Sequence, residues 1–270
     1  MVQRLFPKTH LGGKMVSRIC ILQMKRAGSF RDNVQRAREY LDVARGPDFV
    51  LLGGEFSLNE TNRVDPYPLL AELARSCECN IVAPINANQQ RFGRSRKRGR
   101  SSMHIFGRDG EVLGIQDKQN FYCGEMPWFS SGAQVEIIKV DGVRVGLVRG
   151  LDILFHSYMD GLKAAEVVFF STMATDDIML DLARTRALES RAYYAMSSFV
   201  GRYLGMEFVG NAALIKPKIE RRGRARMASQ PTVMQRIQVE GLVQGAVDIS
   251  YIREIRKRRL EEPEENPISH

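Results

Sequence analysis

The sequence has few cysteines and no long apolar run, and both shortages limit what the protein can be. Only Cys20, Cys77, Cys79 and Cys123 occur in 270 residues, too few for the disulfide framework of a small secreted domain. No run of about 18 apolar residues is present, so no transmembrane helix is expected. The opening MVQRLFPKTHLGGK lacks the apolar core of a secretory signal. These absences predict a cytoplasmic protein.

Metal-ligating residues are also sparse. The Cys77-x-Cys79 spacing is not that of a metal site, and neither His10 nor His104 has ligand-like neighbours. No metal and no other cofactor are therefore expected.

The chain has no Gly/Ser-rich linker, no break in composition and no repeat of solenoid period. It is therefore interpreted as one domain over residues 15–260, preceded by an extension, 1–14, and followed by an acidic tail, 261–270.

Positive charge exceeds negative charge, with 40 Lys and Arg against 31 Asp and Glu, a net charge of +9. Three basic runs, 91–100, 216–226 and 253–259, carry more than this excess, so the remainder of the chain is acidic. Such runs attract phosphates whatever their sequence. Phe92 is the single aromatic residue within them, which gives stacking on single strands little support. Solvated loops or oligomer contacts are favoured, and binding of nucleic acid or acidic partners remains an alternative.

Strand-like and helix-like segments alternate along the chain. Two Asp-Gly pairs, Asp109-Gly110 and Asp141-Gly142, lie between apolar runs and predict β-hairpins. Strands are expected over 15–24, 48–56, 80–88 and 165–173, helices over 29–46, 67–79, 157–166 and 177–197, further strands between 197 and 250, and a last helix over 251–260. This order predicts an α/β fold in which a two-sheet sandwich is flanked by helices.

Ionisable side chains follow three of the expected strands. Glu55 comes directly after the apolar run ending in LLGG, and Lys118 follows the first hairpin, with Glu125 farther along. The third place is the turn Arg149-Gly150-Leu151-Asp152, where a strand passes into a helix. A sharp turn of this kind lifts one side chain clear of the sheet, as a nucleophile requires. Taken singly, each residue is better explained by a structural ion pair.

Taken together, these segments resemble the nitrilase, or carbon–nitrogen hydrolase, superfamily. That family uses a Glu–Lys–Cys triad, with the glutamate at a strand end, the lysine in a Y-x-K-x-x-L segment and the cysteine in a C-[YW]-D turn. LLGGEF, QDKQNF and RGLDILF stand at these places here. ICILQM, EMPWFSSG and ARTRALESRAYYAMSSFVG match further family segments, and the resemblance extends from about residue 15 to residue 259.

The resemblance implies a four-layer α-β-β-α sandwich that pairs with a second copy across a helical layer. It implies a small-molecule ligand, with Glu55 as general base and Lys118 stabilising an oxyanion. Glu125 is expected beside them, and Asp152 and Cys123 are expected to line the ligand site.

The sequence departs from the family at the nucleophile. Gly150 stands where the cysteine is expected, whereas Glu55, Lys118, Glu125 and Asp152 are retained. Glycine has no side chain, so the covalent thiol route is absent. The sequence therefore predicts a pseudoenzyme that binds a small amide, carboxylate or amine.

An active carbon–nitrogen hydrolase remains the alternative hypothesis. It would need a substitute nucleophile, for which Cys123 and the neighbouring pair His156 and Ser157 are the candidates. A second route is direct activation of water by Glu55.

Overall fold

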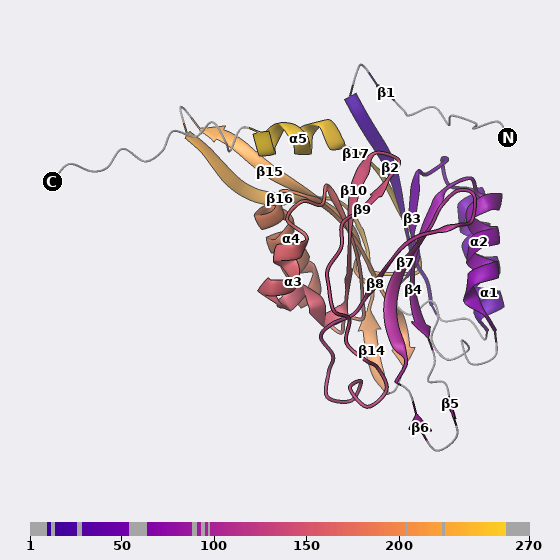
Figure 1. Cartoon of the computed structure of the whole chain (residues 1–270). Helices are drawn as coiled ribbons and strands as arrows, with labels where there is room; N and C mark the ends of the chain where they lie inside the picture. The colour runs from indigo at the N-terminus through magenta and orange to yellow at the C-terminus, as the bar shows by residue number, and fades with distance from the viewer. Residues whose placement is uncertain are drawn as a thin grey trace.

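Two sheets lie face to face in the computed structural model of the chain (Figure 1). The structure describes residues 10–11, 14–25, 29–53, 64–87, 91–92, 95–96, 98–203, 205–222 and 225–257. None of the helices in these ranges combines the length and hydropathy needed to cross a membrane.

The first sheet has the order β1-β2-β3-β4-β7-β8, and β17 pairs with β2. The strands β2, β3 and β4 run parallel, and β7 and β8 form the hairpin expected around Asp109-Gly110. The bounds are β1 His10–Leu11, β2 Lys14–Gln23, β3 Phe49–Leu51, β4 Asn80–Ala87, β7 Arg100–Phe106, β8 Val112–Asp117 and β17 Gly241–Asp248.

The second sheet has the order β16-β15-β12-β11-β10-β9. Its strands β10, β11 and β12 run parallel, and β9 and β10 form the second expected hairpin. The bounds are β9 Ile138–Val140, β10 Val143–Arg149, β11 Val167–Thr172, β12 Tyr193–Ser198, β15 Ala212–Arg222 and β16 Ala225–Ile237. Two short ladders, β5 Arg91–Phe92 with β6 Ser95–Arg96 and β13 Val200–Tyr203 with β14 Met206–Val209, lie outside these sheets.

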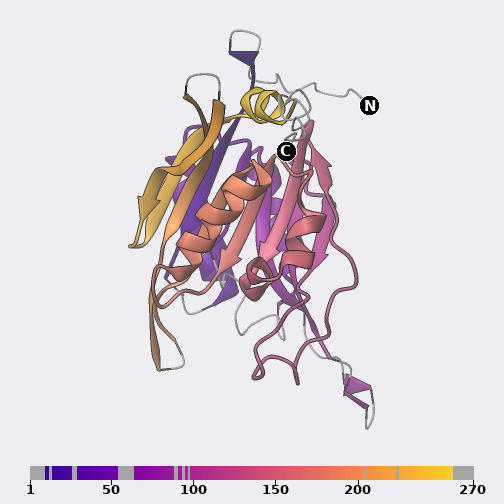
Figure 2. The same ribbon diagram turned by 90° about the vertical axis from the view of Figure 1, so that its left-hand side faces the viewer.

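Helices cover the outer face of each sheet (Figures 1 and 2). The first sheet carries α1 (Phe30–Asp42) and α2 (Pro66–Ser76), and the second carries α3 (His156–Gly161) and α4 (Ile178–Ser190). The last helix is α5 (Ile249–Lys257). Local sequence starts α1, because Ser29 and Asp32 form a reciprocal capping box. The order of layers is α-β-β-α, as the resemblance implies.

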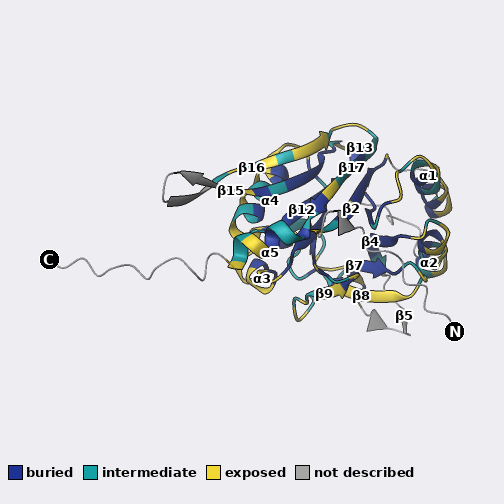
Figure 3. Ribbon diagram, turned by 90° about the horizontal axis from the view of Figure 1, so that it is seen from above, coloured by how far each residue is buried: buried dark blue, intermediate teal, exposed yellow. Residues whose placement is uncertain are grey.

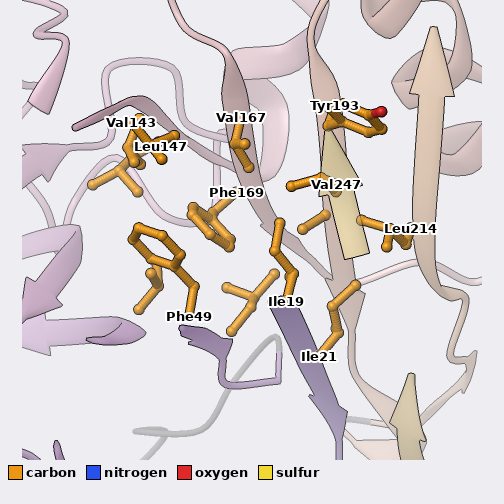
Figure 4. Close-up of a cluster of buried hydrophobic side chains, with 14 of the residues drawn as sticks. Ile19, Ile21, Phe49, Val143, Leu147, Val167, Phe169, Tyr193, Leu214 and Val247 are labelled. Carbon is orange, nitrogen blue, oxygen red and sulfur yellow. The ribbon is translucent and has the colours of Figure 1, made fainter. Parts of the chain in front are cut away.

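The main core fills the space between the sheets (Figure 4). Ile19 and Phe49 of the first sheet meet Phe169 and Leu214 of the second, and the rings of Phe49 and Phe169 lie 5.5 Å apart. The central strands β3, β11 and β12 are buried, whereas β8 at the edge of the first sheet and the outer faces of the helices are exposed (Figure 3). Burial on both faces explains the near-continuous apolar runs of the parallel strands.

One expected helix is too long. The sequence interpretation extended it over 177–197, but α4 ends at Ser190 and Arg191 adopts a left-handed conformation with φ of 49°. Residues Tyr193–Ser198 form β12, and all six are buried between β11 and β15. The residues of β12 have no helix-breaking glycine or proline, so local propensity alone does not end the helix before them. They form a strand because the centre of the sheet buries their apolar side chains.

For the basic run at 216–226 a solvated loop or an oligomer contact is expected, and its described residues do not form a loop. Its described residues continue β15 and begin β16, which pair as far as Arg222 and Ala225. The hairpin therefore places this charge on strands.

Candidate functional site at the ends of β8 and β10

Lys118 lies directly after β8, and backbone hydrogen bonds fix it on both sides. Its N–H donates to Ser101 O at 2.8 Å, and its carbonyl accepts from Gly132 N–H at 3.0 Å. The side chain is only 5% exposed. Its Nζ donates to Glu125 Oε1 at 2.8 Å and Oε2 at 2.7 Å. Burial lowers the pKa of Lys118, and the Glu125 carboxylate opposes that shift.

Glu125 is held by the loop that follows Lys118. The Tyr122 N–H donates to Glu125 Oε2 at 3.0 Å, so the carboxylate also caps its own turn. Lys118 Nζ lies 4.9 Å from the centre of the Phe121 ring, which stacks on Phe129 at 5.9 Å. The two stacked aromatic rings therefore lie on one side of the ion pair.

Gly150 begins a 3-10 helix, Gly150–Leu154, at the end of β10, and its φ is +53°. A Cβ atom at this position would lie 3.3 Å from Lys118 Nζ and 3.5 Å from Lys118 Cε. Apart from the adjoining chain, no other atom of the described residues lies within 4 Å of that point. Position 150 thus faces the Lys118 ammonium group.

Asp152 joins this turn to the chain beyond Lys118. It is fully buried, and its Oδ1 accepts from Gln119 N–H at 3.2 Å and from Asn120 N–H at 2.8 Å. The Asn120 side-chain amide donates to the same oxygen at 2.9 Å. Burial raises the pKa of Asp152 to about 6, against the effect of these hydrogen bonds. Its contacts fix the position of Gly150 relative to Lys118.

Arg149 is a buried residue of the site region to which sequence reasoning gave no role. Its guanidinium group crosses from β10 to the first sheet, where Nη1 donates to Ile85 O at 3.2 Å and Ser102 O at 2.9 Å. The signal in the sequence was an arginine directly after the apolar run VGLV. A buried charge at a strand end needs such partners.

Two further candidates lie at the surface. Cys123 is exposed on the loop that carries Glu125. His156 is largely exposed, and its Nε2 lies 3.4 Å from Asp160 Oδ2. Glu55 lies outside the described residues.

The structure thus brings Lys118, Glu125, Gly150 and Asp152 to one end of the sandwich. An ammonium group stabilises a developing negative oxygen, and the neighbouring carboxylate accepts a hydrogen bond from a ligand N–H. Within the described ranges, no cluster of three or more His, Cys, Asp or Glu residues is arranged to hold a metal ion.

A family model described as carbon-nitrogen hydrolase matches residues 18–257 of the chain. No curated protein sequence matches.

Solved structures share the fold. A carbon-nitrogen hydrolase from Helicobacter pylori G27 has a TM-score of 0.70 at 15% identity, with 92% of this chain and 95% of that chain covered. The C. elegans NitFhit protein has a TM-score of 0.73 at 17% identity, with 94% and 66% covered. A cysteine-to-alanine mutant of the amidase from Nesterenkonia sp. AN1, in complex with butyramide, has a TM-score of 0.70 at 20% identity, with 91% and 96% covered. These likenesses agree with the two-sheet sandwich.

Proposed function

Because the chain belongs to the carbon-nitrogen hydrolase family, we propose that it binds a small amide, carboxylate or amine at Lys118 and Glu125 without thiol catalysis. The proposal rests chiefly on one observation, the 3.3 Å between Lys118 Nζ and the place of a Cβ atom at Gly150. A cysteine there would present its thiol beside the ammonium group. Glycine supplies no nucleophile, so no thioester forms.

The ion pair favours an amide among these ligands. Lys118 Nζ offers N–H donors to a carbonyl oxygen, and Glu125 offers acceptor oxygens to an amide N–H. A carboxylate engages only the first group, and an amine only the second. The partial exposure of Glu125, with 34% of its side chain accessible, leaves this end of the pair open to a ligand.

Binding without the thiol has a parallel in a protein of the same fold. The amidase from Nesterenkonia sp. AN1 is in complex with butyramide when its cysteine is replaced by alanine. This parallel supports ligand binding by a site that lacks the nucleophile.

The binding test uses wild-type protein and butyramide, with acetate and methylamine as the carboxylate and amine probes. The proposal is supported by calorimetric binding of butyramide or acetate that is lost in Lys118→Met, or of methylamine that is lost in Glu125→Gln. Lys139→Met is expected to keep the binding, since Lys139 lies on β9 outside the site. Failure of all three to bind a folded protein contradicts it.

The chemical test restores the thiol. In a Cys123→Ser parent, which lacks the exposed thiol, Gly150→Cys is expected to form a covalent adduct with fluoroacetamide, measured by intact mass. The acetamide moiety of fluoroacetamide adds covalently to the active-site cysteine in a glutamate-to-leucine mutant of the similar amidase. Gly150→Ala is the matched control, with a comparable backbone demand and no thiol. A folded but unreactive Gly150→Cys protein argues against a preserved site.

Turnover by the wild type favours the alternative of an active hydrolase. Amides and nitriles are incubated with wild type and with Glu55→Gln. We expect no turnover by either protein. Turnover that Glu55→Gln abolishes would replace the binding proposal with water attack or a substitute nucleophile.

We also propose that residues 15–260 act as one domain and that two copies pair through the layer of α3 and α4. Three large apolar side chains next to or on these helices are exposed, Leu154 at 45%, Phe155 at 43% and Ile178 at 59%. Native mass spectrometry is expected to give a dimer that Phe155→Glu dissociates. Val43→Glu, directly after α1 on the first sheet's side, is the control, since Val43 is 74% exposed away from this layer. A monomer at all concentrations overturns the pairing.

Several arginines of the basic runs bind other groups of the protein itself, which weakens the alternative that these runs bind nucleic acid. Arg253 Nε donates to the buried Glu166 Oε1 at 2.6 Å, and Arg256 Nη2 donates to Ser190 O at 2.7 Å. Arg100 donates to Ser131 O at 2.7 Å. These arginines hold segments of the fold together.

A further inference from the structure

Three of the four cysteines lie together on the α1–α2 side of the first sheet, in a cluster that the candidate site does not use. Cys77 follows the last residue of α2, Cys79 precedes β4, and Cys20 lies on β2. Cys79 and Cys20 are fully buried, and Cys77 is half-buried and packs against the same cluster. One thiol is therefore accessible and the two others are not.

The turn between α2 and β4 brings Cys77 and Cys79 into contact. Glu78 between them is left-handed, with φ of 49°, and Cys79 N–H closes the turn on Ala74 O at 3.2 Å. Consecutive Cα atoms are about 3.8 Å apart, so a turned residue keeps the two Cα atoms within the ~4.4–6.8 Å that a disulfide needs. A hydrogen bond between the two thiols is the largest influence on the pKa of both cysteines.

The surroundings give the two thiols opposite character. The hydrogen bond with Cys79 is the main cause that lowers the pKa of Cys77 to about 6, helped by Ser76 and by the positive charge of Arg38, whereas burial and Asp42 oppose it. The same hydrogen bond and burial raise the pKa of Cys79. Because Cys77 is accessible and Cys79 is fully buried, Cys77 is the thiol that a solute reaches first and Cys79 the thiol that follows.

We propose that Cys77 and Cys79 form a peroxide-sensitive pair, in which Cys77 is oxidised first and Cys79 closes a reversible disulfide. The Cys77 thiolate attacks one oxygen of hydrogen peroxide, the O–O bond breaks, and sulfenic acid and hydroxide form. The Cys79 sulfur then attacks the Cys77 sulfur, and the sulfenic hydroxyl leaves as water with the Cys79 proton. Overall, two thiols are oxidised, and one peroxide is reduced to two waters.

The location of the pair makes the disulfide reducible. The ring spans a single intervening residue and its Cys77 side is accessible, and strained or exposed disulfides are the labile ones. Cys20 has no such role, because burial raises its pKa to about 12 and keeps it a thiol.

The test uses the full chain with Cys123→Ser, so that the exposed Cys123 does not link two molecules. After treatment with one equivalent of hydrogen peroxide, intact mass is expected to fall by two hydrogen atoms, and peptide mapping to join Cys77 to Cys79. Dithiothreitol is expected to restore both thiols. Because the parent keeps Cys20, Cys77 and Cys79, the mapping tests the cluster with its native residues.

Two variants in that parent assign the roles. Cys79→Ser is expected to gain one oxygen at Cys77 that dimedone traps, and Cys77→Ser is expected to remain unoxidised under the same treatment. Should Cys79→Ser unfold, as judged by circular dichroism, Cys79→Ala takes its place. An unchanged parent mass, a disulfide to Cys20, or equal oxidation in Cys77→Ser overturns the proposal.

Discussion

Both carboxylate oxygens of Glu125 accept hydrogen bonds from the Lys118 ammonium group, at 2.8 and 2.7 Å. The partners differ in exposure, with 5% of the Lys118 side chain accessible and 34% of that of Glu125. Loss of the partner therefore costs more free energy for Lys118 than for Glu125. A buried charge without its counter-charge keeps the full cost of desolvation.

Glu125→Gln is expected to lower the free energy of unfolding by about 1–3 kcal/mol, a range that allows for the partial exposure of the pair. The side-chain carbonyl oxygen of the glutamine still accepts one hydrogen bond from Lys118, but the side chain carries no charge. Urea denaturation measures the change, and Glu111→Gln, at an exposed position, is the control. Adding Lys118→Met to Glu125→Gln should recover part of the loss. Equal stabilities of Glu125→Gln and wild type would contradict a buried ion pair.

Gly150→Ala is expected to destabilise the protein more than Gly205→Ala. Both glycines are left-handed, with φ of +53° and +78°, so both variants carry a backbone cost of about 1–2 kcal/mol. The added Cβ at 150 meets Lys118 Nζ at 3.3 Å, whereas nothing in the described structure lies within 4 Å of the Cβ at 205. The difference in urea midpoint between the two variants measures the crowding at Lys118. Equal midpoints would contradict the prediction and show that the Lys118 side chain moves aside at no cost.

His104 is expected to make the protein less stable in acid. Burial, with help from the charge of Arg149, lowers its pKa to about 4, against about 6.5 in an unfolded chain. The unfolded state then binds more protons between these values, so stability rises with pH through this window, by about 3 kcal/mol in all. His104→Gln removes this rise, measured by urea denaturation from pH 4 to 7. An unchanged pH profile would refute a buried neutral imidazole.

Asp152 is expected to act in the opposite direction. Burial raises its pKa to about 6, so between about pH 4 and 6 the folded state binds more protons and stability falls as pH rises. Asp152→Asn abolishes this fall and leaves the rise due to His104 unopposed. Asp42→Asn, at an exposed position, makes the same charge change. Its plot of stability against pH should run parallel to that of the wild type. A parallel profile for Asp152→Asn would mean that this carboxyl is not buried in solution.

Much of the fold was predictable, because local pattern decides local structure. Both Asp-Gly pairs form hairpins, and the expected strand ends carry Lys118 and Gly150. The end of α4 was not predictable from propensity. Arg191 turns the chain there so that Tyr193 enters the centre of a sheet, and that burial involves strands distant in sequence.

By itself the sequence determined the order of elements, the family resemblance and the lack of a side chain at Gly150. These follow from residue type and spacing. Only the tertiary structure decided that position 150 points at Lys118, that Arg149 spans both sheets, and that Cys77 meets Cys79 across a left-handed residue. Such relations depend on how twisted sheets pack and on one backbone angle, which no periodicity in the sequence encodes.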